Sequence, residues 1–301
     1  MDTRSVESAE PAALSASALR WIRANAGYLD SASARTEIRA TPRAKAFLQL
    51  AQLRHHWAKA RPGDSGLDEV TALVERVWRS PEFVRLLALD PRYARQFQVM
   101  YAGLAPAPEG PHRAVLARLA ADGYLAPNRK SPYLRLETRY YADLAGAPHL
   151  IESYRELYES SLLARRALPV ADLDVCNVTH TVFYLSDFGF RDSGLTSEER
   201  ERALGVVEEL TEHSVRRGEW DLVGKLLLAQ FCLGADPART PSGAAGLRLL
   251  ARAQRPDGAM PGRSSTDRAD ESATPVMLFR KAYQATLVTA LASLIISASP
   301  A

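Results

Sequence analysis

Apolar residues recur along most of the chain at the 3.6-residue spacing of α-helices, and the alternating β-branched runs typical of strands are nearly absent. Proline at the start and glycine at the end of many apolar segments mark helix boundaries. The pattern therefore predicts an all-α protein. The predicted helices span residues 12–28, 41–60, 66–79, 81–90, 92–104, 111–123, 133–146, 149–165, 174–188, 197–217, 220–234, 241–254 and 276–298.

Successive helices in the second half of the chain alternate between charged and uncharged. Segment 197–217 is rich in charge, whereas 222–234 carries only Lys225 and 282–298 carries no charge. A helix that is apolar on every side must be buried on every side, and a helix with a broad charged face borders water. The alternation predicts an α/α toroid of about twelve helices, with an outer ring around an inner ring. A superhelical solenoid is the competing arrangement, but both of its layers normally keep a solvent face.

Four stretches of the sequence resemble parts of other proteins. AQRPDGAMPG, residues 253–262, resembles the Q-x-x-D-G turn of terpene cyclases and protein prenyltransferases, although the aromatic residue after Gly258 is missing. SPYLRLETRYYADLAG, THTVFYLSDFG and YQATLVTALA, within residues 129–296, are similar to an uncharacterised group of actinobacterial proteins associated with natural-product gene clusters. These resemblances imply the toroid fold and a setting in specialised metabolism, but no particular activity.

The composition is that of an ordinary soluble globular protein. The chain has 301 residues, of which 47% are hydrophobic and 24% charged, and its net charge is +3. Such a balanced, mixed charge does not indicate nucleic-acid binding. The N-terminal residues are polar and do not have the basic-then-apolar layout of a signal peptide, and the two cysteines lie in apolar stretches; we therefore expect a cytoplasmic protein. We predict a disordered leader over residues 1–10 and a single domain over residues 11–301.

The uncharged segment AYQATLVTALASLIISA, residues 282–298, raises the possibility of a membrane anchor. It is only 17 residues long and contains polar residues such as Gln284 and Thr286. A membrane span requires about 20 strongly apolar residues. We therefore predict a buried core helix and no membrane association.

The longest predicted loop, residues 255–275, indicates where a site would lie. In a toroid with parallel inner helices, all connections from outer to inner helices lie at one end of the barrel, which we call the functional rim. The loop 255–275 lies there together with the connections at 167–174 and 216–219. Loops of that length in a compact domain are usually functional lids or disordered. The N-terminal ends of the inner helices also give this rim a positive potential. A small-molecule site is therefore expected here.

His180 and Tyr184 are the predicted catalytic residues. On the helix 174–188, Cys176, His180 and Tyr184 share one stripe with Asp187, opposite an apolar stripe. His180 would lie about 9 Å below the rim. Its ordinary pKa, close to neutrality, suits general acid or base catalysis. Tyr184 would orient His180, and the alternative for His180 is a core histidine bonded to a neighbouring helix.

Three residues around the same helix are predicted to be structural. Asp174 is the expected N-cap. It belongs to DLDV, which resembles the D-x-D-D acid motif of class II terpene cyclases, but Val175 replaces the final aspartate. Asp187 lies at the C-terminal end, where the helix dipole is unfavourable to an anion, so we predict an ion pair with Arg191.

Asp221, Asp257 and Tyr283 are the predicted substrate-binding residues. Asp221 begins an inner helix at the functional rim, and Asp257 lies in the long loop. The alternatives are an N-terminal charge for Asp221 and a turn-forming Asp-Gly for Asp257. The mixed charges of LRLETRYY, residues 134–141, favour a salt-bridged helix over a binding surface.

Cys176 and His180, four residues apart, could be zinc ligands, with Cys232 as a third. The lanthionine cyclases, also α/α toroids, hold zinc with two cysteines and one histidine. Their adjacent Cys-His-Gly sequence is missing here, and Cys232 falls near the opposite rim, so we predict no metal. P-loop, G-x-G-x-x-G, H-E-x-x-H, G-x-S-x-G and D-D-x-x-D motifs are also missing.

The sequence thus favours a cofactor-independent acid/base enzyme of specialised metabolism. It would catalyse the cyclisation or hydrolysis of a small molecule in the toroid cavity, or the elimination of a group from it. The competing hypothesis is a non-catalytic protein that binds a carrier protein, a peptide or a small ligand. Glycoside hydrolysis is disfavoured because the inner helices offer few of the required carboxylates.

Overall fold

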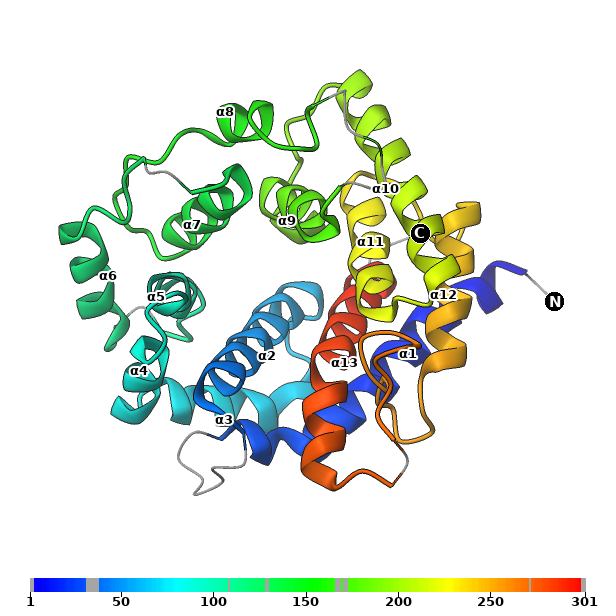
Figure 1. Cartoon of the computed structure of the whole chain (residues 1–301), viewed down its shortest axis with the longest axis horizontal. Coiled ribbons are helices and arrows are strands. Elements are labelled where there is room, and N and C mark those ends of the chain that lie inside the picture. Colours follow the sequence, from blue (N-terminus) through cyan, green and yellow to red (C-terminus); the bar gives the residue numbers. More distant parts are fainter. Residues whose placement is uncertain are drawn as a thin grey trace. The chain divides into compact units, whose positions relative to one another are not determined.

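The structure is a computed structural model of the whole chain (Figure 1). It describes residues 3–30, 38–107, 109–127, 130–165, 169, 173–270 and 272–298, with only the backbone helix described for residues 3–10. Regular structure in these residues is helical, apart from one isolated bridge between Gly262 and Arg268. The predicted all-α class is confirmed.

Most of the predicted helices are present with boundaries close to those expected. The bounds are α1 (Thr3–Asn25), α2 (Ala40–Ala60), α3 (Asp68–Trp78), α4 (Pro81–Ala88), α5 (Ala94–Gly103), α6 (His112–Ala121), α7 (Pro132–Leu144), α8 (Tyr154–Glu159), α9 (Val175–Ser186), α10 (Ser197–Arg217), α11 (Trp220–Cys232), α12 (Pro241–Ala253) and α13 (Pro275–Ala298). Short 3₁₀ turns are η1 (Ala26–Leu29), η2 (Ser65–Leu67) and η4 (Asp187–Gly189).

Two segments differ from the sequence prediction. Helix α1 begins at Thr3, so the backbone of residues 3–10, predicted as a disordered leader, is helical. Helix α8 covers only the middle of the predicted helix 149–165. Arg139 Nη1 donates hydrogen bonds to the carbonyls of residues 151–152. These carbonyls are therefore bonded to a side chain of another helix, and the segment before α8 is not helical.

The chain divides into two compact units, whereas the sequence predicts a single domain. One unit comprises Met1–Ala24, His56–Pro62 and Tyr158–Ala301, and we call it the terminal unit because it contains both chain ends. The other comprises Asn25–His55 and Gly63–Leu157, and we call it the central unit.

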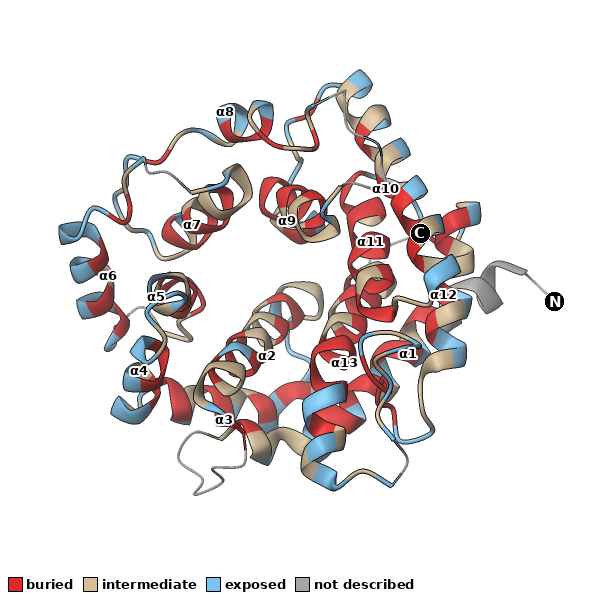
Figure 2. Cartoon of the chain, viewed as in Figure 1, coloured by how far each residue is buried: buried red, intermediate tan, exposed pale blue. Residues whose placement is uncertain are grey.

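In the terminal unit, three helices form an inner layer. Helix α11 packs against α9 and against α13. Helices α9 and α11 run parallel, because Cys176 contacts Lys225 near their N-terminal ends and Gly189 lies against Phe231 near their C-terminal ends. This layer is buried along most of its length (Figure 2). Every residue of the stretch 223–230 of α11 is buried.

The charged helices form an outer layer over α11. Helices α10 and α12 both pack against it. Gly246 of α12 lies directly against Val223 and Leu227 of α11, where a β-carbon would come within 3.0 Å of each side chain. Helix α10 opens with a capping box formed by Thr196 and Glu199, and it keeps an exposed charged face. Within this unit, charged and uncharged helices thus separate into two layers as predicted.

A buried glutamine joins the two layers. Gln230 of α11 accepts a hydrogen bond from Thr240 Oγ1 (2.8 Å) and donates to Thr211 Oγ1 (2.9 Å) and Ser242 Oγ (3.1 Å). These partners lie on α10 and at the start of α12. Because both ends of the buried amide are satisfied, Gln230 fixes the helices without the cost of an unpaired polar group.

The Q-x-x-D-G turn attaches α1 to the end of α12. Gln254 Nε2 donates to the carbonyls of Leu14 and Gly258, both at 3.1 Å. Gly258 has φ +97°, and a β-carbon there would lie 1.9 Å from the carbonyl oxygen of Ser17. The turn therefore requires glycine for its backbone conformation and for the close approach of α1.

Helix α13 is long and apolar enough to cross a membrane, but 67% of its most apolar window is buried within the structure. Trp21 of α1 stacks on Phe279 with ring centroids 5.7 Å apart, and Ser15 Oγ donates to the carbonyl of Ala290. These contacts favour the predicted core helix over a membrane span.

The central unit has its own aromatic core. Helix α5 packs against α4, α6 and α7. Tyr101 of α5 stacks on Trp78 at 4.7 Å, donates a hydrogen bond to the Trp78 carbonyl, and lies beside Phe83. Phe47 of α2 completes the cluster through its contacts with Trp78 and Phe83. Burial of this cluster raises the pKa of Tyr101 to about 12.

Gly258→Ala should destabilise the protein, because the new β-carbon meets the Ser17 carbonyl in a left-handed backbone conformation. We expect a loss of about 2 kcal/mol or more in the free energy of unfolding, measured by urea titration. Gly205→Ala is the matched control, since Gly205 lies on the exposed face of α10 with open space around it. That change should stabilise by about 0.5–1 kcal/mol. Equal effects at both positions would contradict the assigned role of the turn.

Candidate functional site

Three chemically reactive side chains meet near the N-terminal ends of α9 and α11. Lys225 Nζ lies 3.6 Å from Cys176 Sγ and 3.7 Å from Asp221 Oδ2. Lys225 is 9% exposed and Asp221 8% exposed. They are the only charged residues of α11. The cluster of Cys176, Asp221 and Lys225 therefore combines a thiol, a carboxylate and an ammonium inside an otherwise apolar layer.

Local sequence holds each group of this cluster in place. Asp174 caps α9 as predicted, accepting hydrogen bonds from the backbone N–H groups of Cys176 (2.8 Å) and Asn177 (3.4 Å). Asp221 lies in the first turn of α11, where the helix dipole favours an anion. Lys225 follows four residues later on the same face. The cap and the helix spacing thus fix the thiol and the ion pair at the same end of the layer.

Stability alone does not account for this ion pair. Burying two charges carries a desolvation cost that their attraction often fails to repay, and apolar replacements are frequently as stable. The remaining buried residues of α11 are apolar, apart from Gln230. Lys225 and Asp221 are therefore candidates for a chemical role. Sequence reasoning missed Lys225, although a single lysine in an otherwise buried, apolar helix was the available signal.

The structure brings His180 and Tyr184 together on α9. Their ring centroids are 5.8 Å apart, and the His180 ring also lies 6.0 Å from that of Phe183. His180 is partly exposed and Tyr184 is buried. His180 follows Cys176 by one helical turn, so it lies on the stripe that leads from the Cys176 cluster along α9.

Arg263 links the start of α11 to α13. Its carbonyl accepts a hydrogen bond from the Asp221 backbone N–H (3.1 Å), and its guanidinium donates to Gln284 Oε1 (3.0 Å). Tyr283 stacks on Phe279 with ring centroids 5.6 Å apart. Burial raises the pKa of Tyr283, and the positive charge of Arg263 opposes that rise. Tyr283 therefore lies close to Arg263, as part of an aromatic row.

The long loop is docked on the inner layer in its described residues. The N–H of Ser265 donates to the Gly218 carbonyl (2.9 Å), and the N–H of Met260 donates to Thr286 Oγ1 (2.9 Å). Asp257 accepts a hydrogen bond from the Ala259 N–H at 3.0 Å. Its side chain is 52% exposed. Asp257 therefore forms this turn, which was one of the two roles considered for it, and its part in substrate binding stays a prediction.

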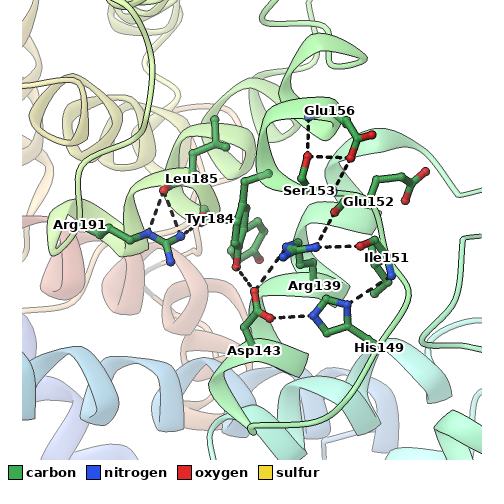
Figure 3. Close-up of polar contacts among 11 residues, drawn as sticks. Arg139, Asp143, His149, Ile151, Glu152, Ser153, Glu156, Tyr184, Leu185 and Arg191 are labelled. Atoms are coloured by element: carbon green, nitrogen blue, oxygen red, sulfur yellow. Dashed lines mark hydrogen bonds and ion pairs between the residues drawn. The ribbon is translucent and has the colours of Figure 1, made fainter.

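The C-terminal end of α9 is held by two cations. Lys59 Nζ donates to both carboxylate oxygens of Asp187, at 2.8 and 3.0 Å. Arg191 Nη2 donates to the carbonyls of Tyr184 and Leu185, both at 3.1 Å (Figure 3). The sequence predicted an ion pair between Asp187 and Arg191. The structure instead pairs Asp187 with Lys59, which precedes it by 128 residues, while Arg191 binds backbone carbonyls of α9.

The two cysteines lie at opposite ends of the inner layer, as the sequence predicted. Cys232 is in the last turn of α11, near the C-terminal end of α9. Burial raises the pKa of the Cys232 thiol to about 12. Among the described residues, no group of three or more histidine, cysteine, aspartate or glutamate side chains could hold a metal ion. Much of the predicted rim segment 167–174, including Asp172, lies outside these residues.

A second polar network, in the central unit, is structural. Arg139 binds the carbonyls of residues 151–152 and pairs with Asp143 at 3.5 Å (Figure 3). Asp143 also accepts a hydrogen bond from Tyr154 Oη (2.8 Å) and lies 2.7 Å from His149 Nε2. These bonds attach α7 to the segment before α8. They give the LRLETRYY helix the salt-bridged role that its charges indicate.

A model of the DUF6895 family, described as a domain of unknown function, matches residues 15–294. The chain belongs to this family. No curated protein and no solved structure matches it. The match agrees with the prediction of an uncharacterised family. The description of DUF6895 assigns no activity, so a function for this member rests on the chemistry of its own residues.

The two cysteines should react differently with iodoacetamide at pH 8. Cys176 is partly exposed and lies beside the Lys225 ammonium, whereas Cys232 is buried with a pKa of about 12 and stays a thiol. We expect one modification per native chain, located at Cys176 by peptide mass spectrometry, and two after unfolding. Modification of Cys232 at the same rate as Cys176 in the native protein would contradict this arrangement.

Proposed function

We propose that this DUF6895 protein is a cofactor-independent acid/base enzyme that acts on a small molecule. The site would lie at the N-terminal ends of α9 and α11. The observation that carries the proposal is the placement of Lys225 between Asp221 and Cys176 at almost complete burial. A setting in specialised metabolism, suggested by the sequence resemblance, and a cytoplasmic location, suggested by the two cysteines in apolar stretches, are parts of the same proposal.

Each group in the site has a distinct chemical task. His180 transfers a proton to or from the substrate, and ring packing against Tyr184 orients it. The Lys225 ammonium stabilises the negative charge that develops on a substrate oxygen during cyclisation, elimination or hydrolysis. Such a charge interacts more strongly with a fixed cation in a site that excludes water. Asp221 holds Lys225 in position, and Tyr283 and Arg263 contact the substrate from the side of α13.

We also propose the α/α-toroid fold for this chain. The support is the separation of the terminal unit into an inner layer of largely apolar helices and an outer layer of charged ones. Small-angle X-ray scattering tests this proposal. A closed, compact chain of this length should have a radius of gyration of about 19 Å. A substantially larger value would favour an extended solenoid.

The catalytic proposal is tested by deleting the gene in the host organism and comparing metabolites after restoring wild-type or variant protein. His180→Asn should lower the rate of product formation about 10²–10⁴-fold, the usual contribution of a general acid or base. Asp221→Asn combined with Lys225→Met should also abolish the product. This double change removes both charges and leaves neither one buried alone.

His213→Asn is the matched control, because His213 lies on the outer helix α10. It should leave product formation unchanged. Circular dichroism of each purified variant checks that it is folded. If folded His180→Asn and the double variant both form product at the wild-type rate, the catalytic proposal fails. Binding of a carrier protein, a peptide or a small ligand then becomes the better explanation.

A further inference from the structure

A cavity in the central unit contains none of the residues of the proposed catalytic site. It has a volume of about 510 Å³ and is lined by residues 39–42, at the start of α2, and residues 89–93, between α4 and α5. Thr41 Oγ1 links the two walls through a hydrogen bond to Asp90 Oδ2 at 3.5 Å. Sites for small molecules usually have volumes of about 300–1,000 Å³. The cavity is therefore large enough to hold one small molecule.

Part of the cavity wall is apolar and accessible to solvent. The described residues include five large hydrophobic side chains that are exposed, and two of them, Leu89 (62% exposed) and Tyr93 (41% exposed), line this cavity. The rings of Pro42 and Pro91 add further apolar groups to the same lining. Exposed apolar surface that gathers in a hollow is typical of binding sites, because a bound apolar group removes that surface from water. The wall therefore indicates a ligand with an apolar body.

Asp90 fixes the shape of the wall between α4 and α5. Its carbonyl accepts hydrogen bonds from the backbone N–H groups of Tyr93 (3.0 Å) and Ala94 (2.9 Å). Its carboxylate accepts three more from Arg92, namely from the backbone N–H (3.2 Å), Nε (3.1 Å) and Nη2 (2.9 Å). A wall that is already ordered loses little conformational entropy when a ligand binds. The cavity is thus preorganised.

The charges around the cavity leave one cation for a ligand. The charged residues in its lining are Arg39, Asp90 and Arg92. Arg92 pairs with Asp90 at 2.9 Å, and its hydrogen bonds hold the pKa of the Asp90 carboxyl below its ordinary value, so both partners are charged at neutral pH. Arg39 is exposed, and its side chain forms no ion pair or hydrogen bond with the residues that the structure describes. The cavity therefore carries one positive charge that is not balanced from within.

We propose that this cavity binds small monocarboxylic acids that have an apolar body. The carboxylate pairs with the Arg39 guanidinium, whose planar fork of N–H groups matches a carboxylate, and the apolar body covers Leu89 and Tyr93. A single guanidinium suits a carboxylate better than a phosphate monoester, which carries about −1.5 to −2 charges at pH 7. The site lies within the central unit and does not depend on the activity proposed for the terminal unit.

The test uses the purified full chain and octanoate as the probe, with 1-octanol as its uncharged match. An octanoate analogue that carries a photoreactive diazirine in its chain is irradiated with the protein, and peptide mass spectrometry locates the label. We expect label in residues 39–42 and 89–93, with octanoate competing more strongly than the same concentration of octanol. Label confined to other parts of the chain overturns the proposal, and equal competition by octanol overturns the preference for a carboxylate.

Variants of exposed residues, which should leave the protein folded, separate the two parts of the site by isothermal titration calorimetry. Arg39→Met should raise the Kd of octanoate about three- to fivefold and leave that of octanol unchanged, since it removes one exposed charge pair. Leu89→Ala should raise the Kd of both ligands, because it removes apolar contact area. Arg118→Met is the matched control, since Arg118 is an exposed arginine of α6 outside the cavity lining. If Arg39→Met affects octanoate no more than Arg118→Met does, or if Leu89→Ala changes neither Kd, the proposed site is overturned.

Discussion

A helix that is apolar on nearly every side has to be covered on nearly every side, and α11 imposes that requirement on the terminal unit. Helices α9 and α13 pack against α11 within the inner layer, and α10 and α12 cover it from outside. Gln230 is the polar exception along its middle, and its partners on α10 and α12 help to fix the outer layer. The charged residues of α11 lie toward its N-terminal end. There the helix dipole favours the Asp221 carboxylate, and the loop binds the backbone through the Arg263 carbonyl. The position of Lys225 and Asp221 is thus a consequence of how the layers are built.

The pattern of apolar and charged residues was sufficient to predict the helices and the two layers of the terminal unit, because both follow from solvent exposure. The N-cap at Asp174 could also be predicted, because an N-cap depends only on residues that are close in the sequence. The partners of Cys176 and Asp187 could not be predicted. Lys225 is 49 residues from Cys176 and Lys59 is 128 residues from Asp187, and no local spacing connects such pairs. The docking of the long loop could not be predicted either, because it depends on hydrogen bonds to helices that precede and follow it in the chain.

The attachment of α1 to the C-terminal helices has a consequence for synthesis on the ribosome. Ser15 bonds to Ala290, 275 residues later, and Trp21 stacks on Phe279. At a rate of about 5–20 residues per second, α1 leaves the ribosome roughly 15–60 seconds before its partners are made. During that interval Leu14, Trp21 and Ile22, which are buried in the finished structure, have no native cover. The nascent chain therefore carries an exposed apolar helix for most of its translation, and this helix is a natural substrate for chaperones that bind emerging polypeptides.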